Sequence, residues 1–292
     1  MKEKWRLDVL LCRRNLVESR HKAQTLIMSG SVFVNGRRED KAGAQLTEDA
    51  EIEVRDKANA YVSRGGLKLE KALDTFGISP ENWAVLDAGA STGGFTDCLL
   101  RRGAKKVYAV DVGYGQLDWR LRNDRRVVCL ERTNVRYLTK EQVPELVDLV
   151  TLDLSFISLG LVLPVIRKFL QDTGQVCCLI KPQFEAGKEQ VGKKGVVRDK
   201  KVHIQVLERF LDMAGNCGFS IKGITYSPIK GPEGNIEFLG HLAAGGEAPW
   251  NETASCSKAQ AEPMIETKKA GAHVRNETIA LVEQAHEALR GG

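Results

Sequence analysis

The chain has 292 residues, of which 42% are hydrophobic, and this is enough for one large core and one small additional domain. No apolar run approaches the roughly 20 residues that span a bilayer, and the first residues lack the apolar segment of a secretory signal, so we expect a cytoplasmic protein with no membrane partner. Seven cysteines without C-x-x-C spacing argue against a disulfide framework and a zinc site, and we expect no bound metal.

The net charge of +5 is unevenly distributed. Residues 1–38 contain nine lysines and arginines but only Glu3, Asp8 and Glu18 as acids. This asymmetry indicates a polyanionic partner, although a solvated basic face would have the same composition.

Residues 6–54 have the pattern of a small α+β unit. Ser19 can cap a helix whose apolar stripe ends at Gly30, and residues 32–34 form a short strand before the turn signal Asn35-Gly36. Residues 51–54 alternate as a further strand.

After a polar linker, Leu69, Ala72, Leu73 and Phe76 follow the spacing of an amphipathic helix that ends at Gly77. From Trp83 onward, strands alternate with helices, which predicts an α/β fold with a parallel sheet covered on both faces. The predicted strands are residues 84–87, 107–111, 127–130, 146–153, 175–180, 221–226 and 237–242. Residues after about 243 are rich in small and polar residues, so we expect a flexible tail to about residue 271 and a last helix at 275–289.

The segment from Val85 to Phe95 ends a strand in Asp87 and then turns through glycines. Gly89 and the pair Gly93-Gly94 give the spacing G-x-x-x-G-G, which differs from the G-x-G-x-x-G pattern of dinucleotide-binding proteins. Asp87 suits a cofactor that carries amine and sulfonium charge better than one that carries a pyrophosphate, so the pattern favours S-adenosyl-L-methionine over NAD. Asp111, at the carboxyl end of the next strand, can hold the ribose. A purely structural turn is the alternative.

Several spaced positions in residues 6–36 together resemble an S4 RNA-binding domain: Arg6-Leu-Asp8, Ser19-Arg20, Ala23, Leu26-Ile27, Gly30 and Val32-Phe-Val-Asn-Gly36. The resemblance implies a basic face that binds structured RNA largely through its backbone and shape. The matching candidates are Arg6, Arg13, Arg14, Arg20, Lys22, Arg37 and Arg38.

A second set of residues resembles the FtsJ-type ribose 2′-O-methyltransferases: Ser63-Arg-Gly-Gly-Leu-Lys68, the Asp87 to Gly94 turn, Asp153, Lys181-Pro182 and Glu237. An S4 domain ahead of such a domain is similar to the TlyA family. Its members methylate cytidine 2′-oxygens in 16S and 23S ribosomal RNA and were also described as haemolysins. The resemblance implies a Rossmann-like S-adenosylmethionine methyltransferase sheet with an N-terminal S4 domain. The expected domain boundaries are an S4-like RNA-binding domain at residues 1–58, a linker at 59–64 and an FtsJ-like methyltransferase domain at 65–243. Residues 244–292 are expected to form a flexible tail with a C-terminal helix.

The resemblance also implies the roles of the site residues. Lys181 would activate the acceptor hydroxyl, with Asp153 and Lys68 as electrostatic partners and Glu237 as the orienting carboxylate. Lys71 and Glu233 lie close enough in sequence to be confused with Lys68 and Glu237. The implied cofactor-binding residues are Asp87, Gly89, Ser91, Gly93, Gly94, Asp111, Val112, Thr133, Asn134 and Asp153.

The expected partner is ribosomal RNA or a ribosomal subunit, with no obligate protein partner. Three alternatives stay open: methylation of an RNA base, a non-catalytic S4 ribosome-binding factor and a haemolysin. A base amino-group methyltransferase usually carries two prolines where this chain has Asp153-Leu-Ser-Phe156, and those prolines are missing. The haemolysin alternative has only the family's history in its favour.

Overall fold

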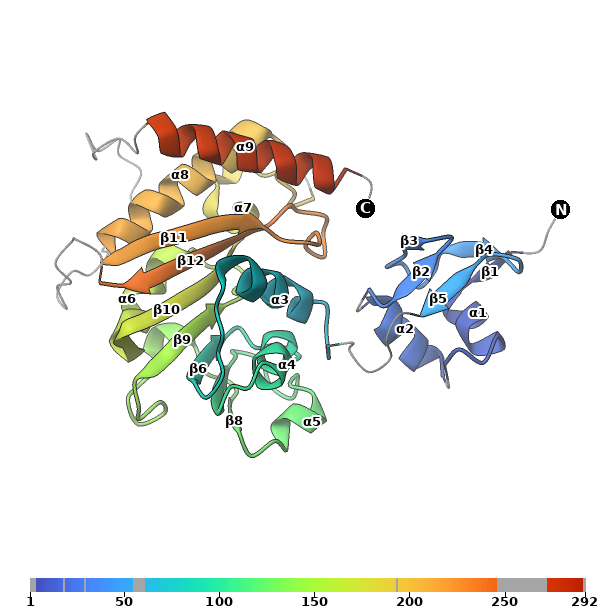
Figure 1. The fold of residues 1–292 in the computed structure, drawn as a ribbon, viewed down its shortest axis with the longest axis horizontal. Coiled ribbons are helices and arrows are strands. Elements are labelled where there is room, and N and C mark those ends of the chain that lie inside the picture. Colours follow the sequence, from blue (N-terminus) through green and yellow to red (C-terminus); the bar gives the residue numbers. More distant parts are fainter. Residues whose placement is uncertain are drawn as a thin grey trace.

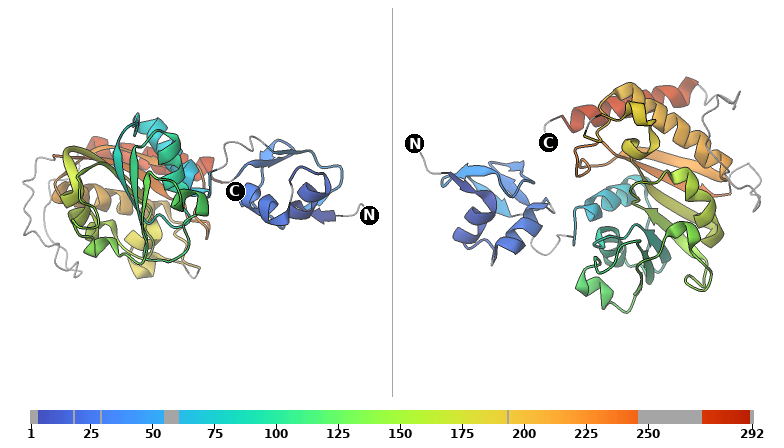
Figure 2. Two further views of the ribbon diagram at one scale, coloured as in Figure 1. Left: turned by 90° about the horizontal axis from the view of Figure 1, so that it is seen from below. Right: turned by 180° about the vertical axis from the view of Figure 1, so that it is seen from behind.

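The computed structural model describes residues 4–17, 19–28, 30–54, 61–192, 194–245 and 272–290. The described chain forms a small N-terminal unit of helices and short strands and a larger unit around a seven-stranded sheet (Figure 1). Both further views show the N-terminal unit as a separate body beside the larger one (Figure 2). The separation agrees with the expected α/β methyltransferase sheet preceded by a small α+β domain.

The N-terminal unit follows the predicted order of helix and hairpin. Its elements are β1 (Lys4–Arg6), α1 (Leu7–Arg13), α2 (Arg20–Met28), β2 (Val32–Val34), β3 (Arg37–Arg38), β4 (Gln45–Thr47) and β5 (Ile52–Val54). The hydroxyl of Ser19 accepts a bond from the backbone N–H of Lys22 at 3.2 Å, which confirms the predicted helix start. Asn35 and Gly36 have φ values of 49° and 74°, as a type I′ hairpin turn requires. Buried leucine, isoleucine, valine and alanine side chains fill the space between the helices and the sheet.

The large sheet has the strand order β11-β12-β10-β9-β6-β7-β8. Its strands are β6 (Ala84–Ala88), β7 (Lys106–Val110), β8 (Val127–Leu130), β9 (Val147–Leu152), β10 (Leu170–Ile180), β11 (Phe219–Tyr226) and β12 (Phe238–Ala244). All are parallel except β12, which runs antiparallel to both neighbours. The predicted parallel sheet is therefore confirmed, with β12 as the one antiparallel strand. Residues 227–237 are too few to make the crossover helix that a parallel connection needs.

Helices cover both faces of this sheet. One face carries α3 (Gly65–Phe76), α4 (Gly94–Arg101) and α5 (Trp119–Arg122), and the other carries α6 (Leu163–Ile166) and α8 (Lys200–Asn216). Shorter turns of helix are η1 (Val135–Tyr137), η2 (Leu159–Leu161), η3 (Arg167–Phe169), α7 (Pro182–Glu185) and η4 (Lys188–Gln190). Neighbouring strand residues pack on opposite faces: Cys177 joins the α3 side and Cys178 the α8 side. The cysteines of the described part of the chain are free thiols.

Helix α3 forms where the apolar spacing predicts it. It ends at Gly77, whose φ of 66° places the backbone in the left-handed region and whose N–H donates to the carbonyl of Leu73. Leu69, Ala72 and Leu73 are buried against the sheet. Lys68, one residue before this stripe, is also buried and is 7% exposed.

The last helix, α9 (Ala272–Ala288), confirms the helix expected near the C-terminus. Val282 and Ala285 are fully buried, and the helix packs on α8 and β11 along the outer edge of the large unit (Figure 1). His286 Nε2 lies 2.9 Å from Nδ1 of His203 on α8. Nearly all of the tail expected to be flexible lies outside the described residues. No described helix is long and apolar enough to cross a membrane.

Candidate active site

The glycine turn after β6 lies directly against the end of β9. The N–H groups of Gly89 and Ala90 both donate to the carbonyl of Val110, at 2.8 and 3.1 Å. Gly89 has a φ of 86°, and a Cβ atom on it would lie 2.4 Å from the carbonyl oxygen of Asp153. Only glycine meets both conditions, so this residue lets the turn and the Asp153 strand end meet at one edge of the sheet.

Asp87, the last acid before the turn, is fully buried. Its carboxylate oxygens accept hydrogen bonds from the hydroxyls of Thr96 at 2.7 Å and Thr151 at 2.8 Å. The side chain therefore joins β6, α4 and β9 beneath the turn and does not face the cavity described below. Burial raises the pKa of Asp87 to about 6, and the negative charge of Asp153 adds to this shift.

This raised pKa predicts a pH dependence of folding. Because the folded-state pKa lies above the unfolded value of 3.8, the contribution of Asp87 to stability is fully present below about pH 4 and is lost as the pH rises through about 6. Relative to the variant Asp87→Asn, the wild type should lose about 3 kcal/mol of unfolding free energy across this range. Urea unfolding of both proteins at pH 4, 5, 6 and 7 checks this. If the difference in unfolding free energy between the two proteins stayed the same from pH 4 to pH 7, the raised pKa of Asp87 would be contradicted.

Asp111, after β7, connects two turns. Its carboxylate accepts the backbone N–H of Ser91 at 2.8 Å and that of Gly113 at 2.7 Å. Thr133 follows the neighbouring strand and donates its N–H to the carbonyl of Asp111 at 2.9 Å. Asn134 starts η1 by accepting the N–H of Arg136 at 3.0 Å, and Val112 is 70% exposed beside these turns. The residues predicted to hold a nucleoside thus come together around Asp111.

Lys68 and Glu237 form a buried ion pair between distant parts of the chain. The Lys68 Nζ lies 2.6 Å from Oε2 of Glu237, and the two side chains are 8% and 1% exposed. Glu237 directly precedes the antiparallel strand β12, so it lies at the same edge as the carboxyl ends of the parallel strands. The two residues that could be confused with this pair in the sequence lie elsewhere: Glu233 is exposed, and the Lys71 Nζ lies 3.5 Å from the centroid of the Tyr226 ring.

Lys181 and Asp153 form a second ion pair at the ends of adjacent strands. The Lys181 Nζ lies 2.6 Å from Oδ1 of Asp153 and donates to Oγ of Ser155 at 3.1 Å. Lys181 is 8% exposed, while the Asp153 side chain keeps 21% exposure. The ammonium group is therefore held by two partners in an almost fully buried position.

A cavity of about 390 Å³ lies beside the glycine turn. Among the residues that line it are Lys68, Asp153, Gly89, Ser91 and Gly94. The cavity thus brings one member of each ion pair to the glycine turn. Asp153 belongs to both the predicted catalytic set and the predicted cofactor set, and the structure places it where the two meet.

Phe156 was not predicted as a site residue, although it lies in the Asp153-Leu-Ser-Phe156 segment. Its side chain is 91% exposed, its φ is 64°, and its ring centroid lies 5.1 Å from that of Phe184 on α7. A positive φ on an aromatic residue is strained, and such strain concentrates at functional sites. Glu185 stabilises this loop by accepting the Ser158 hydroxyl at 2.7 Å and the Leu159 N–H at 2.8 Å.

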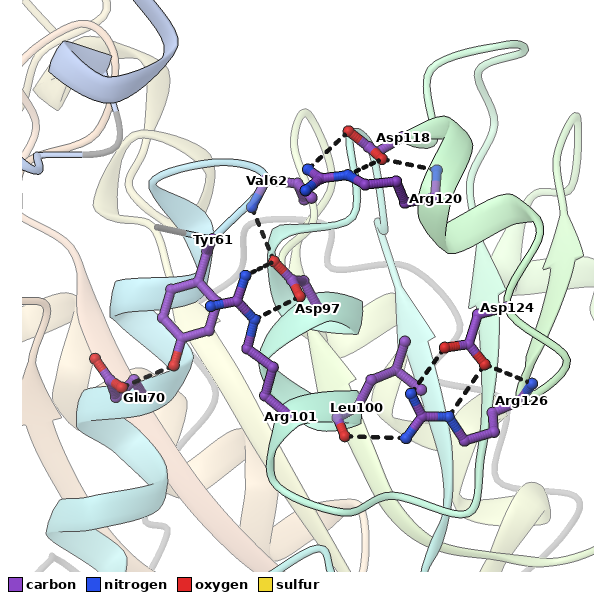
Figure 3. A network of polar contacts seen from close by, with 10 residues as sticks. All are labelled: Tyr61, Val62, Glu70, Asp97, Leu100, Arg101, Asp118, Arg120, Asp124 and Arg126. Carbon is purple, nitrogen blue, oxygen red and sulfur yellow. Dashed lines mark hydrogen bonds and ion pairs between the residues drawn. The ribbon is translucent and has the colours of Figure 1, made fainter. Parts of the chain in front are cut away.

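The start of the large unit is anchored by a network of polar contacts (Figure 3). The Val62 N–H donates to Asp97 on α4 at 2.9 Å, and Arg101 donates to both oxygens of the same carboxylate. The Tyr61 hydroxyl donates to Glu70 on α3 at 2.7 Å, and Arg101 lies 4.9 Å over the Tyr61 ring. Val62 itself lines the cavity, so these contacts fix one of its walls.

The predicted RNA-binding side chains of the N-terminal unit differ in their surroundings. Arg14 donates to the carbonyls of Glu48 and Ala50, and Arg38 is half-buried, which lowers the pKa of its guanidinium. Arg13 pairs with Glu48 at 3.3 Å and lies 4.2 Å over the ring of Trp5. Lys22 and Arg37 are exposed. Arg6 and Arg20 each form an ion pair with the carboxylate of Asp8.

The sheet, the glycine turn and the paired charges around the cavity define a Rossmann-like methyltransferase joined to a small basic domain. An FtsJ-like methyltransferase family model matches residues 61–244, and an S4 domain model matches residues 5–52. The chain belongs to the FtsJ-like methyltransferase family.

Relatives with both parts cover most of the chain. YqxC of Bacillus subtilis, provisionally called an rRNA methyltransferase, is 47% identical over 99% of this chain and 96% of its own length. The 16S/23S rRNA (cytidine-2'-O)-methyltransferase TlyA of Mycobacterium tuberculosis is 46% identical over 82% of this chain and 90% of its own length. Hemolysin A of Brachyspira hyodysenteriae is 47% identical over 81% and 99%. A solved structure from Streptococcus thermophilus, provisionally called a hemolysin, is 43% identical, covers 99% and 98%, and superposes with a TM-score of 0.70.

Proposed function

We propose that the protein transfers a methyl group from S-adenosylmethionine to the ribose 2′-oxygen of a cytidine in 16S or 23S ribosomal RNA, in the cytoplasm. The observation that carries the proposal is the pair of lysine–carboxylate contacts, Lys68 with Glu237 and Lys181 with Asp153, around the cavity that the glycine turn lines. The choice of cytidine and of these two ribosomal RNAs as substrates follows the name of the TlyA relative.

The cofactor supplies an electrophilic methyl group on sulfur. When bound, it would give this methyl group to the 2′-oxygen and keep the electron pair of the broken carbon–sulfur bond on sulfur, while the hydroxyl proton would pass to solvent. Lys181 is the side chain that would hold this oxygen and stabilise its developing negative charge, because its ammonium group is held at the strand end by Asp153, which lines the cavity. Asp153 and Ser155 keep the Lys181 Nζ in place.

Within the same proposal, the remaining predicted residues position the donor. The absence of a side chain at Gly89, Gly93 and Gly94 and the small side chain of Ser91 would allow a close approach of the methionine end. Asp87 supports this turn from below through Thr96 and Thr151. Asp111 would bind the ribose of the cofactor, and Val112, Thr133 and Asn134 would border its adenine.

The decisive experiment measures transfer of labelled methyl from S-adenosylmethionine to ribosomal subunits from a strain that lacks this modification. Subunits from a methylated strain are the control, and alkaline hydrolysis of the product identifies the methylated position. Label in an alkali-resistant dinucleotide supports the proposal. Label in a base would show a base methyltransferase, binding without transfer would show a ribosome-binding factor, and lysis of blood cells without transfer would show a haemolysin.

Phe156 should hold the target nucleotide. An aromatic side chain that is 91% exposed and directly follows Ser155, the hydrogen-bond partner of Lys181, can stack on a base, and such stacking contributes about 1–3 kcal/mol. We therefore expect Phe156→Ala to lower kcat/KM for ribosomal RNA by about tenfold or more, with an unchanged Kd for S-adenosylmethionine. Leu146→Ala is the matched control, because Leu146 is 52% exposed next to the amino-terminal end of β9. Equal activity of the two variants would argue against this role.

A further inference from the structure

Asp8 is a fully buried carboxylate in the most basic part of the chain. It lies in the first turn of α1 and accepts hydrogen bonds from three side chains. Arg6 donates from Nε to one carboxylate oxygen and from Nη2 to the other, both at 3.0 Å. Arg20 Nη2 and Gln24 Nε2 donate to the second oxygen at 3.1 and 3.0 Å.

The two arginines remain available to a ligand. Their side chains are 46% and 59% exposed, although each is held by Asp8 at its guanidinium. A guanidinium group has five N–H donors, so the bonds to Asp8 leave further donors on each arginine. Arg6 ends β1 and Arg20 begins α2, so Asp8 fixes the spacing of two cations from different elements.

A carboxylate on a surface that binds RNA would by itself repel phosphate. Asp8 is shielded from that surface because it has no exposed area, and the hydrogen bonds from Arg6 hold the pKa of its carboxyl well below its usual range. Two long side chains that are already fixed lose less conformational entropy when they bind than free ones do. Asp8 therefore favours RNA binding by fixing the positions of the two arginines, while its negative charge opposes RNA binding.

We propose that Asp8 is a positioning residue for RNA recognition, which holds Arg6 and Arg20 at one fixed spacing for adjacent backbone phosphates. The inference rests on the proposed RNA substrate and concerns how the N-terminal domain binds it. It assigns a role to a residue that does not itself contact the RNA.

The test compares Asp8→Asn with Glu48→Gln in the full-length protein. Each change removes one negative charge from the same domain, and Glu48 also pairs with an arginine, Arg13. If charge alone governs binding, both variants should bind a ribosomal RNA fragment more tightly than the wild type. Positioning by Asp8 predicts instead that Asp8→Asn binds about tenfold more weakly, which equals about 1.4 kcal/mol, while Glu48→Gln binds at least as tightly as the wild type.

Two further readouts separate positioning from a general structural role. The slope of log Kd against log salt should fall by about 0.9 for each RNA phosphate that the Asp8→Asn variant no longer neutralises. In the methyl-transfer assay, KM for RNA should rise while kcat and the Kd for S-adenosylmethionine stay unchanged. Circular dichroism and thermal unfolding establish that the variant is folded at the assay temperature.

Arg6→Lys provides an independent variant that keeps the charge but cannot make the two-pronged contact with Asp8. It should weaken RNA binding in the same direction as Asp8→Asn. If the wild type binds RNA and both folded variants bind it equally well or better, the positioning role is wrong while the proposed function stands. If the wild type itself fails to bind RNA, the proposed function fails first.

Discussion

Lys181→Ala should abolish methyl transfer and leave S-adenosylmethionine binding nearly unchanged. Lys181 bonds to Asp153 and Ser155, where the proposed function places the acceptor hydroxyl, and it is not among the residues of the glycine turn. Loss of a positioned group that assists proton removal typically costs 10²- to 10⁴-fold in rate, and we expect a fall of about 10³-fold or more. Single-turnover transfer of labelled methyl and calorimetric titration with S-adenosylmethionine measure the two quantities.

Two controls sharpen this experiment. Lys71→Ala removes a lysine that contacts the Tyr226 ring instead of a carboxylate in the site, so it should retain transfer. Lys181→Arg keeps the positive charge but changes its shape, so it should recover little activity if the Nζ geometry matters. Full transfer by Lys181→Ala would exclude Lys181 as the residue that acts on the acceptor.

Breaking the ion pair of Lys68 and Glu237 should reduce both stability and activity. The two charges are 2.6 Å apart and almost fully buried. Removing one partner leaves an uncompensated buried charge, which typically costs about 3–5 kcal/mol. We therefore expect Glu237→Leu and Lys68→Met each to lower the unfolding free energy by about this amount, as urea denaturation would measure.

The double variant Lys68→Met/Glu237→Leu separates the two effects. Replacing both charges by apolar side chains of similar size is often neutral or stabilising, so stability should return to near the wild-type value. Activity should stay low, because the charged pair at the cavity is gone. Recovery of methyl transfer together with stability would show that the pair is only structural.

These two experiments address different parts of one site. Lys181 is held by Asp153 at the end of a strand, whereas Lys68 is held by Glu237 at the end of a loop and lines the cavity. Asp153 connects the two, because it bonds to Lys181, lines the same cavity and contacts the glycine turn through its carbonyl. This arrangement predicts that Lys181→Ala loses rate with normal cofactor binding. It predicts that Lys68→Met loses both stability and activity.

Local physical rules determined much of this protein from its sequence. Period-3.6 spacing located α3, the Asn35-Gly36 turn located the first hairpin, and apolar runs ending in Asp87, Asp111, Asp153 and Lys181 located the edge of the sheet that carries the site. Each of these signals depends on residues that are close in sequence. The resemblance to known families then selected Lys68 over Lys71 and Glu237 over Glu233, and the structure pairs the selected residues.

Tertiary structure decided the contacts between distant residues. Lys68 and Glu237 are 169 positions apart, and their pairing depends on the antiparallel return of β12, which strand patterns alone did not reveal. Asn235 shows the same dependence, since its side chain accepts the Val197 N–H and donates to the Gly195 carbonyl, both at 2.9 Å, and so connects two loops. The partners of Asp8, the exposure of Phe156 and the burial of Asp87 likewise follow from packing, because a residue's surroundings are set by segments that its own neighbours in sequence do not specify.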